Sequence, residues 1–177
     1  MEEVAPQKDF AFDVGANDGY DTYGLAWLMS KGNQRPVDII SFEPGAGNMP
    51  SLLQPREWQE YSNCTITVVQ KFVGAEDSDD YVTLDNFHKS HPELHGKSGL
   101  IKIDIEGFET EALNGAQDIL QNDKHDWLIE IHGKDRVAEV AAHFTRVKRA
   151  FLIKDLSALP FIGNEHREID TYWLMTI

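Results

Sequence analysis

The sequence has little cysteine and few basic residues, and each shortage excludes a class of protein. Cys64 is the single cysteine among 177 residues, so neither an intrachain disulfide nor a cysteine-based zinc site can form. Lysine and arginine number 16 against 30 acidic residues, which gives a formal net charge of −14. Because a protein that binds a phosphate backbone needs a basic surface, we expect no nucleic-acid partner.

Long apolar runs are also absent. No stretch of the sequence approaches the roughly 20 apolar residues that a membrane-spanning helix needs. Residues 1–6 have neither the basic start nor the apolar core of a secretory signal. We therefore expect a cytoplasmic protein without a membrane partner. The length suits one domain over residues 1–177, and a hydrophobic content of 41% is ordinary for such a domain.

Apolar runs typical of strands alternate with amphipathic patterns typical of helices. Strands are predicted at residues 10–14, 37–42, 65–73, 100–105, 127–131, 151–153 and 172–175, and helices at 19–31, 108–122 and 135–148. Because no helical pattern separates the last two strands, we expect an antiparallel last strand in an otherwise parallel sheet. The predicted fold class is α/β: a Rossmann-like, doubly wound sheet of seven strands with helices on both faces.

The turn after the first strand, residues 13–19 (DVGANDG), predicts the kind of cofactor. Its glycines do not follow the G-x-G-x-x-G spacing of a dinucleotide site, and Asp13 and Asp18 would repel a pyrophosphate. A cofactor with an ammonium and a sulfonium group would be attracted, as S-adenosylmethionine is. A nicotinamide-dependent oxidoreductase is the disfavoured alternative. The predicted cofactor-binding residues in this turn are Asp13, Gly15, Ala16, Asn17 and Gly19.

Glu43 is the second element of the predicted cofactor site. It ends the second predicted strand, where a carboxylate accepts hydrogen bonds from ribose hydroxyls in nucleotide-binding folds. Glu43 alone could also be an ordinary loop acid. Together with the turn at residues 13–19, it predicts ribose binding.

Several segments together resemble the FkbM-type methyltransferases, a branch of the class I S-adenosylmethionine-dependent enzymes. They are residues 12–19, 42–44, 82–87, 101–109, 113–116 and 129–132. The resemblance implies methylation of a hydroxyl oxygen, commonly on a sugar or polyketide-like small molecule. Family members often carry more sequence ahead of the first strand than the nine residues before Phe10. A cofactor-binding module without its own catalysis, as one domain of a larger assembly, therefore stays open. A homo-oligomer is a separate possibility that the sequence leaves open.

Methyl transfer requires an acceptor oxygen in line with the breaking bond and a group that takes its proton. Asp104 and Glu106 follow the fourth strand, and alternation places them on the same side as Lys102. We predict that Asp104 faces the reacting centre and the cofactor, while Glu106 orients the cofactor or acceptor. The plain structural alternative is a helix start, where acidic residues are favourable.

His132 is the third predicted catalytic residue, as a base whose tautomer Glu130 would fix. The structural alternative is a hydrogen-bonded loop residue at a strand end. Asp104, Glu130 and His132 also permit a divalent metal. Because no asparagine or second aspartate follows the fifth strand, we expect no metal site. The spaced histidines His88, His91 and His95 are interrupted by Pro92, so we interpret them as a solvated connector.

Overall fold

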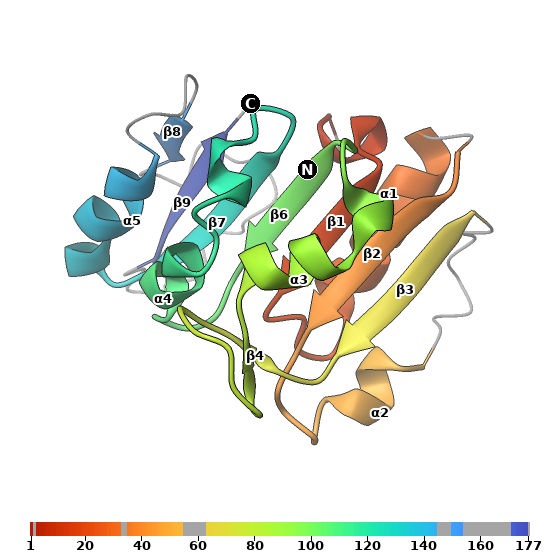
Figure 1. Ribbon diagram of the computed structural model, residues 1–177, viewed down its shortest axis with the longest axis horizontal. Coiled ribbons are helices and arrows are strands. Elements are labelled where there is room, and N and C mark those ends of the chain that lie inside the picture. The colour runs from red at the N-terminus through yellow and green to blue at the C-terminus, as the bar shows by residue number, and fades with distance from the viewer. Residues whose placement is uncertain (2, 33–34, 55–62, 145–149, 154–170, 177) are drawn as a thin grey trace, which may run out of the picture.

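The computed structural model describes residues 1, 3–32, 35–54, 63–144, 150–153 and 171–176, and of 134, 150–153 and 171–173 the backbone alone. Within these residues, seven strands form one sheet in the order β3-β2-β1-β6-β7-β9-β8 (Figure 1). The strands are β1 (Phe10–Val14), β2 (Val37–Phe42), β3 (Cys64–Val69), β6 (Gly99–Ile103), β7 (Asp126–His132), β8 (Ala150–Ile153) and β9 (Thr171–Thr176). Strand β9 runs antiparallel to β7 and β8, whereas the other pairings are parallel. The predicted fold class is confirmed.

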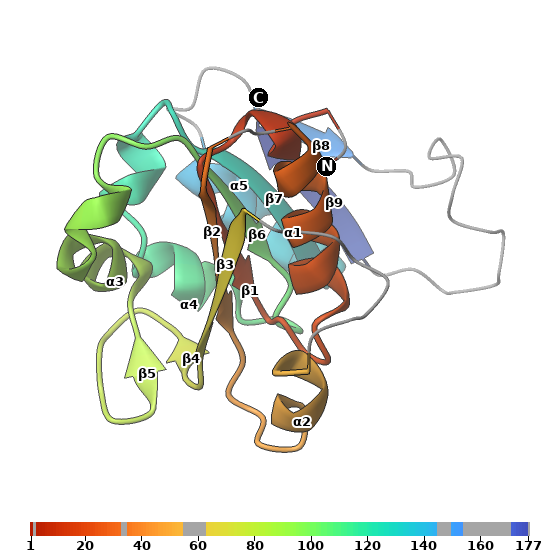
Figure 2. The same cartoon turned by 90° about the vertical axis from the view of Figure 1, so that its right-hand side faces the viewer.

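Helices cover both faces of the sheet, as the alternation of strands and helices predicts. The helices are α1 (Tyr20–Gly32), α2 (Met49–Leu52), α3 (Leu84–Ser90), α4 (Glu109–Asn114) and α5 (Val137–His143). Figure 1 shows α1 behind the sheet, and Figure 2 shows it on the other side of the sheet from α3 and α4. Helix α5 packs in the same core as α3 and α4. Side chains of β1 enter the two cores in turn: Ala11 packs in the α1 core and Phe12 in the other. Burial on both faces explains why β1 and β6 are apolar almost throughout.

The predicted strand at residues 65–73 is wrong in its second half. The backbone turns sharply after β3, where the Lys71 amide donates to the carbonyl oxygen of Val69 over 2.9 Å. The chain then forms β4 (Phe72–Val73), which pairs in parallel with β5 (Tyr81–Val82) in a separate small sheet. Apolar residues continue through this turn, so the sequence pattern alone does not reveal it.

Two predicted helices are shorter than expected. Helix α4 ends at Asn114 and is followed by Gly115, where a Cβ atom would overlap the carbonyl oxygen of Gly74. A separate 3-10 turn follows at Ile119–Gln121. Helix α5 follows a 3-10 turn at Lys134–Arg136, and predicted residues 145–148 lie outside the described part. The histidine segment is interrupted before Pro92 as expected, because α3 ends at Ser90 and a separate 3-10 turn covers Pro92–Leu94. The interpretation as a connector is wrong for His88, which lies inside α3.

The strand order places a crevice at the carboxyl edge of the sheet. Strands β1 and β6 are neighbours, and the chain leaves β1 toward β2 on one side and β6 toward β7 on the other. Such a reversal of strand order is where α/β folds bind ligands. The turns after β1, β2 and β6 meet at this edge. Among the described residues, no helix is long and apolar enough to cross a membrane.

Candidate functional site

The turns after β1 and β6 are in direct contact. Gly15 has a φ of +83°, and a Cβ atom there would overlap the carbonyl oxygen of Asp104. The amides of Gly15 and Ala16 both donate to the carbonyl oxygen of Phe42, over 3.0 and 3.1 Å. Only glycine combines this conformation with this close approach. Gly15 thus joins the three strand ends that form the site.

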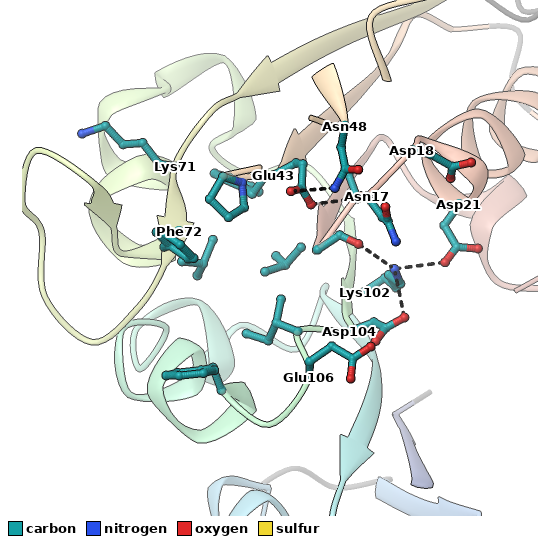
Figure 3. Close-up of a pocket in the computed structure, with 18 of the residues that line it drawn as sticks. Asn17, Asp18, Asp21, Glu43, Asn48, Lys71, Phe72, Lys102, Asp104 and Glu106 are labelled. Atoms are coloured by element: carbon teal, nitrogen blue, oxygen red, sulfur yellow. Dashed lines mark hydrogen bonds and ion pairs between the residues drawn. The ribbon is translucent and has the colours of Figure 1, made fainter. Parts of the chain in front are cut away.

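Glu43 is held in place by three donors. Its Oε2 accepts from the Asn17 amide over 2.9 Å, and its Oε1 accepts from the Gly45 amide and from Asn48 Nδ2 over 2.7 and 3.1 Å. Only 7% of the residue is exposed, and that part faces the cavity described below (Figure 3). Among the residues that the structure describes, Oε2 accepts this one bond, and a carboxylate oxygen can accept two, so Glu43 has an acceptor position left for a ligand.

A buried lysine neutralises the acids beneath the site. Lys102 Nζ lies 3.1 Å from Asp13 Oδ1, 3.0 Å from Asp21 Oδ2 and 3.7 Å from Asp104 Oδ2. Burial opposes its charge, but the three carboxylates outweigh burial and raise the pKa of Lys102. Burial also raises the pKa of Asp13, which Lys102 and the Thr22 hydroxyl offset. Lys102 therefore stays positively charged and fixes Asp104 from one side.

The three turns enclose a cavity of about 450 Å³. Its walls are residues 14–18, 42–44, 71–73 and 104–106, with side chains from neighbouring elements. Figure 3 shows Asp21, Lys102 and Asp104 on one side and Lys71 and Phe72 on the other. The cavity thus has an acidic wall and an opposite wall with an exposed aromatic ring. The predicted site residues that line it are Gly15, Ala16, Asn17, Glu43, Asp104 and Glu106.

Three predicted site residues do not line the cavity. Asp13 is fully buried and is linked to the site through Lys102. Gly19, with a φ of +92°, packs against Leu52 and Tyr23. His132 lies beside the cavity, at the end of β7.

The turn after β6 brings His132 toward several acids. Glu106 and Gly107 have positive φ values of 54° and 99°, which reverse the chain into α4. The buried Glu109 Oε1 lies 2.9 Å from both the Gly107 amide nitrogen and His132 Nδ1. Burial opposes the charged imidazole, but Glu109 and the nearby Asp104 and Glu130 raise the pKa of His132.

Glu130 is close enough to Asp104 for the two carboxylates to repel. Burial and then the Asp104 charge raise the pKa of Glu130 to about 7. Asp104 therefore lies between two groups of charges, with Lys102 beside Oδ2 and His132 3.7 Å from Oδ1. This position connects the cavity to the histidine.

Sequence reasoning missed two parts of the site. The aromatic wall includes Phe72 and Tyr81, whose stacked rings are 5.0 Å apart, and exposed Phe108. It depends on the β4–β5 pairing, which has no local sequence signal. Glu109 was also missed as a partner of His132. Its acidic character at a helix start gave no sign that it would be fully buried.

The fold and the site together define the class of protein. It is a Rossmann-like α/β domain with a cavity for a ligand where the strand order reverses. The sequence-family model described as the methyltransferase FkbM domain matches residues 61–172 of this chain. The chain belongs to the FkbM methyltransferase family, which confirms the resemblance predicted from sequence. The matched region contains Asp104, Glu130 and His132 but begins after Gly15 and Glu43.

Solved methyltransferase structures share this fold. The FkbM methyltransferase from Methylobacillus flagellatus KT is 20% identical with a TM-score of 0.65, and the match covers 96% of this chain and 44% of that one. The chain therefore spans less than half of that protein's length. The precorrin-6y C5,15-methyltransferase from Geobacter metallireducens GS-15 is 11% identical with a TM-score of 0.54, covering 99% and 86%.

A Streptococcus mutans protein assigned as a methyltransferase, solved in complex with SAH, is 10% identical with a TM-score of 0.52, covering 99% and 94%. At such identities the likeness establishes the fold alone. No curated protein matches the sequence.

Proposed function

We propose that the chain is an S-adenosylmethionine-dependent O-methyltransferase whose acceptor is a hydroxyl group on a sugar or another small natural product. The observation that carries this proposal is the shared cavity in which the free acceptor position of Glu43 and the acids near Asp104 face the same space. Family membership supports methyl transfer, and the SAH complex of the Streptococcus mutans protein supports the donor.

Each part of the cavity has a proposed task in holding the cofactor. Glu43 accepts hydrogen bonds from the ribose hydroxyls, and the Asn17 amide keeps its carboxylate in position. Asp21 and Asp104 attract the cationic end, since both carboxylates border the cavity. When bound, S-adenosylmethionine supplies a methyl group on a positively charged sulfur.

The turn after β6 is the proposed reacting centre. Most of the rate enhancement in methyl transfer comes from placing the acceptor in line with the methyl group. Asp104, fixed by Lys102, is rigid enough for that task, whereas the Glu106 side chain is 88% exposed and can orient an incoming acceptor. His132 lies beside Asp104 as a group that can influence the acceptor proton.

The aromatic wall is the proposed contact surface for the rest of the acceptor. Phe72, Tyr81 and Phe108 are 47%, 39% and 59% exposed, and all three line the cavity. Exposed rings at a cavity can stack on the apolar face of a sugar or on a conjugated ring. The acceptor oxygen would then lie toward the opposite, acidic wall.

Calorimetric titration tests the donor. S-adenosylmethionine should bind the wild-type protein, and Glu43→Ala should weaken binding by about tenfold or more, since a hydrogen bond to a charged group is lost. The control Glu93→Ala, an exposed residue of the 3-10 turn Pro92–Leu94, should bind as the wild type does. Tighter binding of NADH than of S-adenosylmethionine would contradict the proposal.

Turnover with a panel of hydroxylated sugars and natural products tests the reaction. Asp104→Asn should lower kcat much more than it weakens S-adenosylmethionine binding. An equal loss of both would make Asp104 a cofactor ligand only. If no member of the panel is methylated although the cofactor binds, a cofactor-binding module becomes the better description.

A further inference from the structure

The acids around His132 form a cluster with an unusual spacing. His132 Nε2 lies 3.7 Å from Asp104 Oδ1, 3.9 Å from Glu130 Oε1 and 3.9 Å from Glu106 Oε2. These distances are too long for direct hydrogen bonds. The nitrogen therefore faces three carboxylates without bonding to any of them.

The spacing fits ligands arranged around a metal ion. Nitrogen and oxygen ligands lie roughly 2.0–2.3 Å from a divalent ion, so neighbouring and opposite ligand atoms are about 3–4.5 Å apart. The ligand atoms of Asp104, Glu130 and His132 all lie within 4.8 Å of one another. An ion between them would need only small side-chain adjustments.

The buried position of Glu109 behind His132 is a second, independent indication of a ligand. It is fully buried, and its Oε1 lies 2.9 Å from His132 Nδ1, so Nδ1 donates to it and Nε2 is directed at the acids. Glu109 Oε2 is buried and has no hydrogen-bond partner in the described part of the chain. A buried carboxylate behind a histidine is the usual support for a metal-binding imidazole.

The charge balance also calls for a cation. Among the described residues, no lysine or arginine forms an ion pair with Glu106, Glu109 or Glu130, and Lys102 reaches only the other oxygen of Asp104. Four carboxylates thus surround one imidazole. A divalent ion would supply the missing positive charge.

We propose that Asp104, Glu130 and His132 bind a divalent metal ion at the border of the cofactor cavity, with Glu109 as the residue that orients His132. This inference replaces our expectation of no metal site. One imidazole and two carboxylates suit Mn²⁺ or Zn²⁺, whereas Mg²⁺ prefers oxygen ligands alone. Three protein ligands leave coordination positions open for an exogenous group.

The role of the ion rests on the proposed function. An acceptor hydroxyl in an open position would become more acidic and pass its proton to solvent water. Its oxygen would then form the new bond to the methyl carbon as the carbon–sulfur bond breaks, and the sulfur would keep that electron pair as a neutral thioether. Asp104 borders both the metal cluster and the cavity, which brings the two reactants together.

Titration of the EDTA-treated, dialysed protein with MnCl₂ tests the site, followed by calorimetry and by loss of the free Mn²⁺ electron paramagnetic resonance signal. We expect one saturable site, and a loss of affinity of at least tenfold in His132→Ala and Glu130→Gln. Glu109→Gln should weaken binding by about 10–100-fold, as removal of a supporting carboxylate does. Glu111→Gln, an exposed residue of the same helix, is the matched control and should not change it.

Circular dichroism of each variant checks that it is folded, and Glu130→Gln at the partly exposed position remains informative if Glu109→Gln unfolds. Absence of saturable Mn²⁺ binding, or unchanged affinity in both His132→Ala and Glu130→Gln, would overturn the proposal. Titration with S-adenosylmethionine in EDTA separates the two proposals. Donor binding without Mn²⁺ binding rejects the metal site alone, and the reverse rejects the methyl donor alone.

Discussion

The amino and carboxyl ends of β6 and β7 differ in how well their acidic side chains are balanced by basic ones. At the amino end, acids have basic partners: Asp126 of β7 lies 2.6 Å from Lys8, and Lys97, just before β6, lies 2.9 Å from Asp38 of the nearby β2. At the carboxyl end, Lys102 is shared by three carboxylates, and His132 faces further acids. Paired charges hold the fold together, whereas unbalanced charges cost stability and persist where a ligand completes them. The contrast indicates which end of the sheet is built for binding.

Among the variants that test this contrast, replacement of Lys102 should lower the stability of the protein most. In Lys102→Met, Asp13 remains fully buried without its cation, which costs about 3–5 kcal/mol of unfolding free energy. Urea unfolding at neutral pH measures the loss. The matched control at the other end, Lys97→Met, removes a partly exposed pair and should cost at most about 1 kcal/mol.

A second variant identifies the cause of that loss. Asp13→Asn added to Lys102→Met removes the unpaired charge and should recover part of the stability. Two outcomes would contradict this explanation: an equal loss of stability in Lys97→Met and Lys102→Met, or no recovery in the double variant. Either would show that Lys102 does not stabilise the fold by neutralising the buried charge of Asp13.

Gly15→Ala tests the contact between the two turns of the carboxyl end. A left-handed φ and overlap with the Asp104 carbonyl oxygen should together cost about 2–4 kcal/mol and weaken cofactor binding. Gly24→Ala is the control, because Gly24 lies inside α1 with open space around it. That change should stabilise the protein by about 0.5–1 kcal/mol. Equal stabilities of the two variants in urea would show that the turns are not tightly joined.

The sequence predicted those parts of the molecule that depend on local patterns. Strands β1 and β2 have the predicted bounds, because largely apolar runs end before Gly15 and Glu43. The residues that end these strands also predicted where the site lies, because parallel strands end at the same edge of a sheet. The β4–β5 pair was not predicted, because its two short strands depend on pairing with each other and have no periodic sequence pattern.

The metal cluster shows the same limit for the site. Asp104, Glu130 and His132 were recognised as neighbours from strand order, yet no metal was expected, because the usual residue types were incomplete. What changes that view is Glu109, whose burial against His132 depends on how α4 packs on β7. Such contacts follow from tertiary packing and cannot be derived from spacing along the chain.

His125, at the amino end, gives the smallest and most specific test of the comparison. Burial, with His88, Lys8 and Lys124 nearby, lowers the pKa of His125 to about 4. Its Nδ1 accepts from the Gly99 amide over 3.1 Å, which requires the unprotonated nitrogen. Because the unfolded chain binds a proton near pH 6.5 and the folded chain does not, stability is complete above pH 6.5 and falls toward pH 4, by at most about 3 kcal/mol.

His125→Asn keeps an acceptor near the Gly99 amide but removes the titrating group. Urea unfolding between pH 7 and pH 4 should therefore show a flatter pH dependence than in the wild type, though not a flat one, since burial also lowers the pKa of His88. His95→Asn, at an exposed position beside His88, should change the slope less than His125→Asn does. An unchanged slope in His125→Asn would mean that the amino end is not held by a neutral histidine. A flatter slope would show that the histidine directly before β7 is kept neutral for stability, in contrast to His132 at the other end of this strand, which lies among acids.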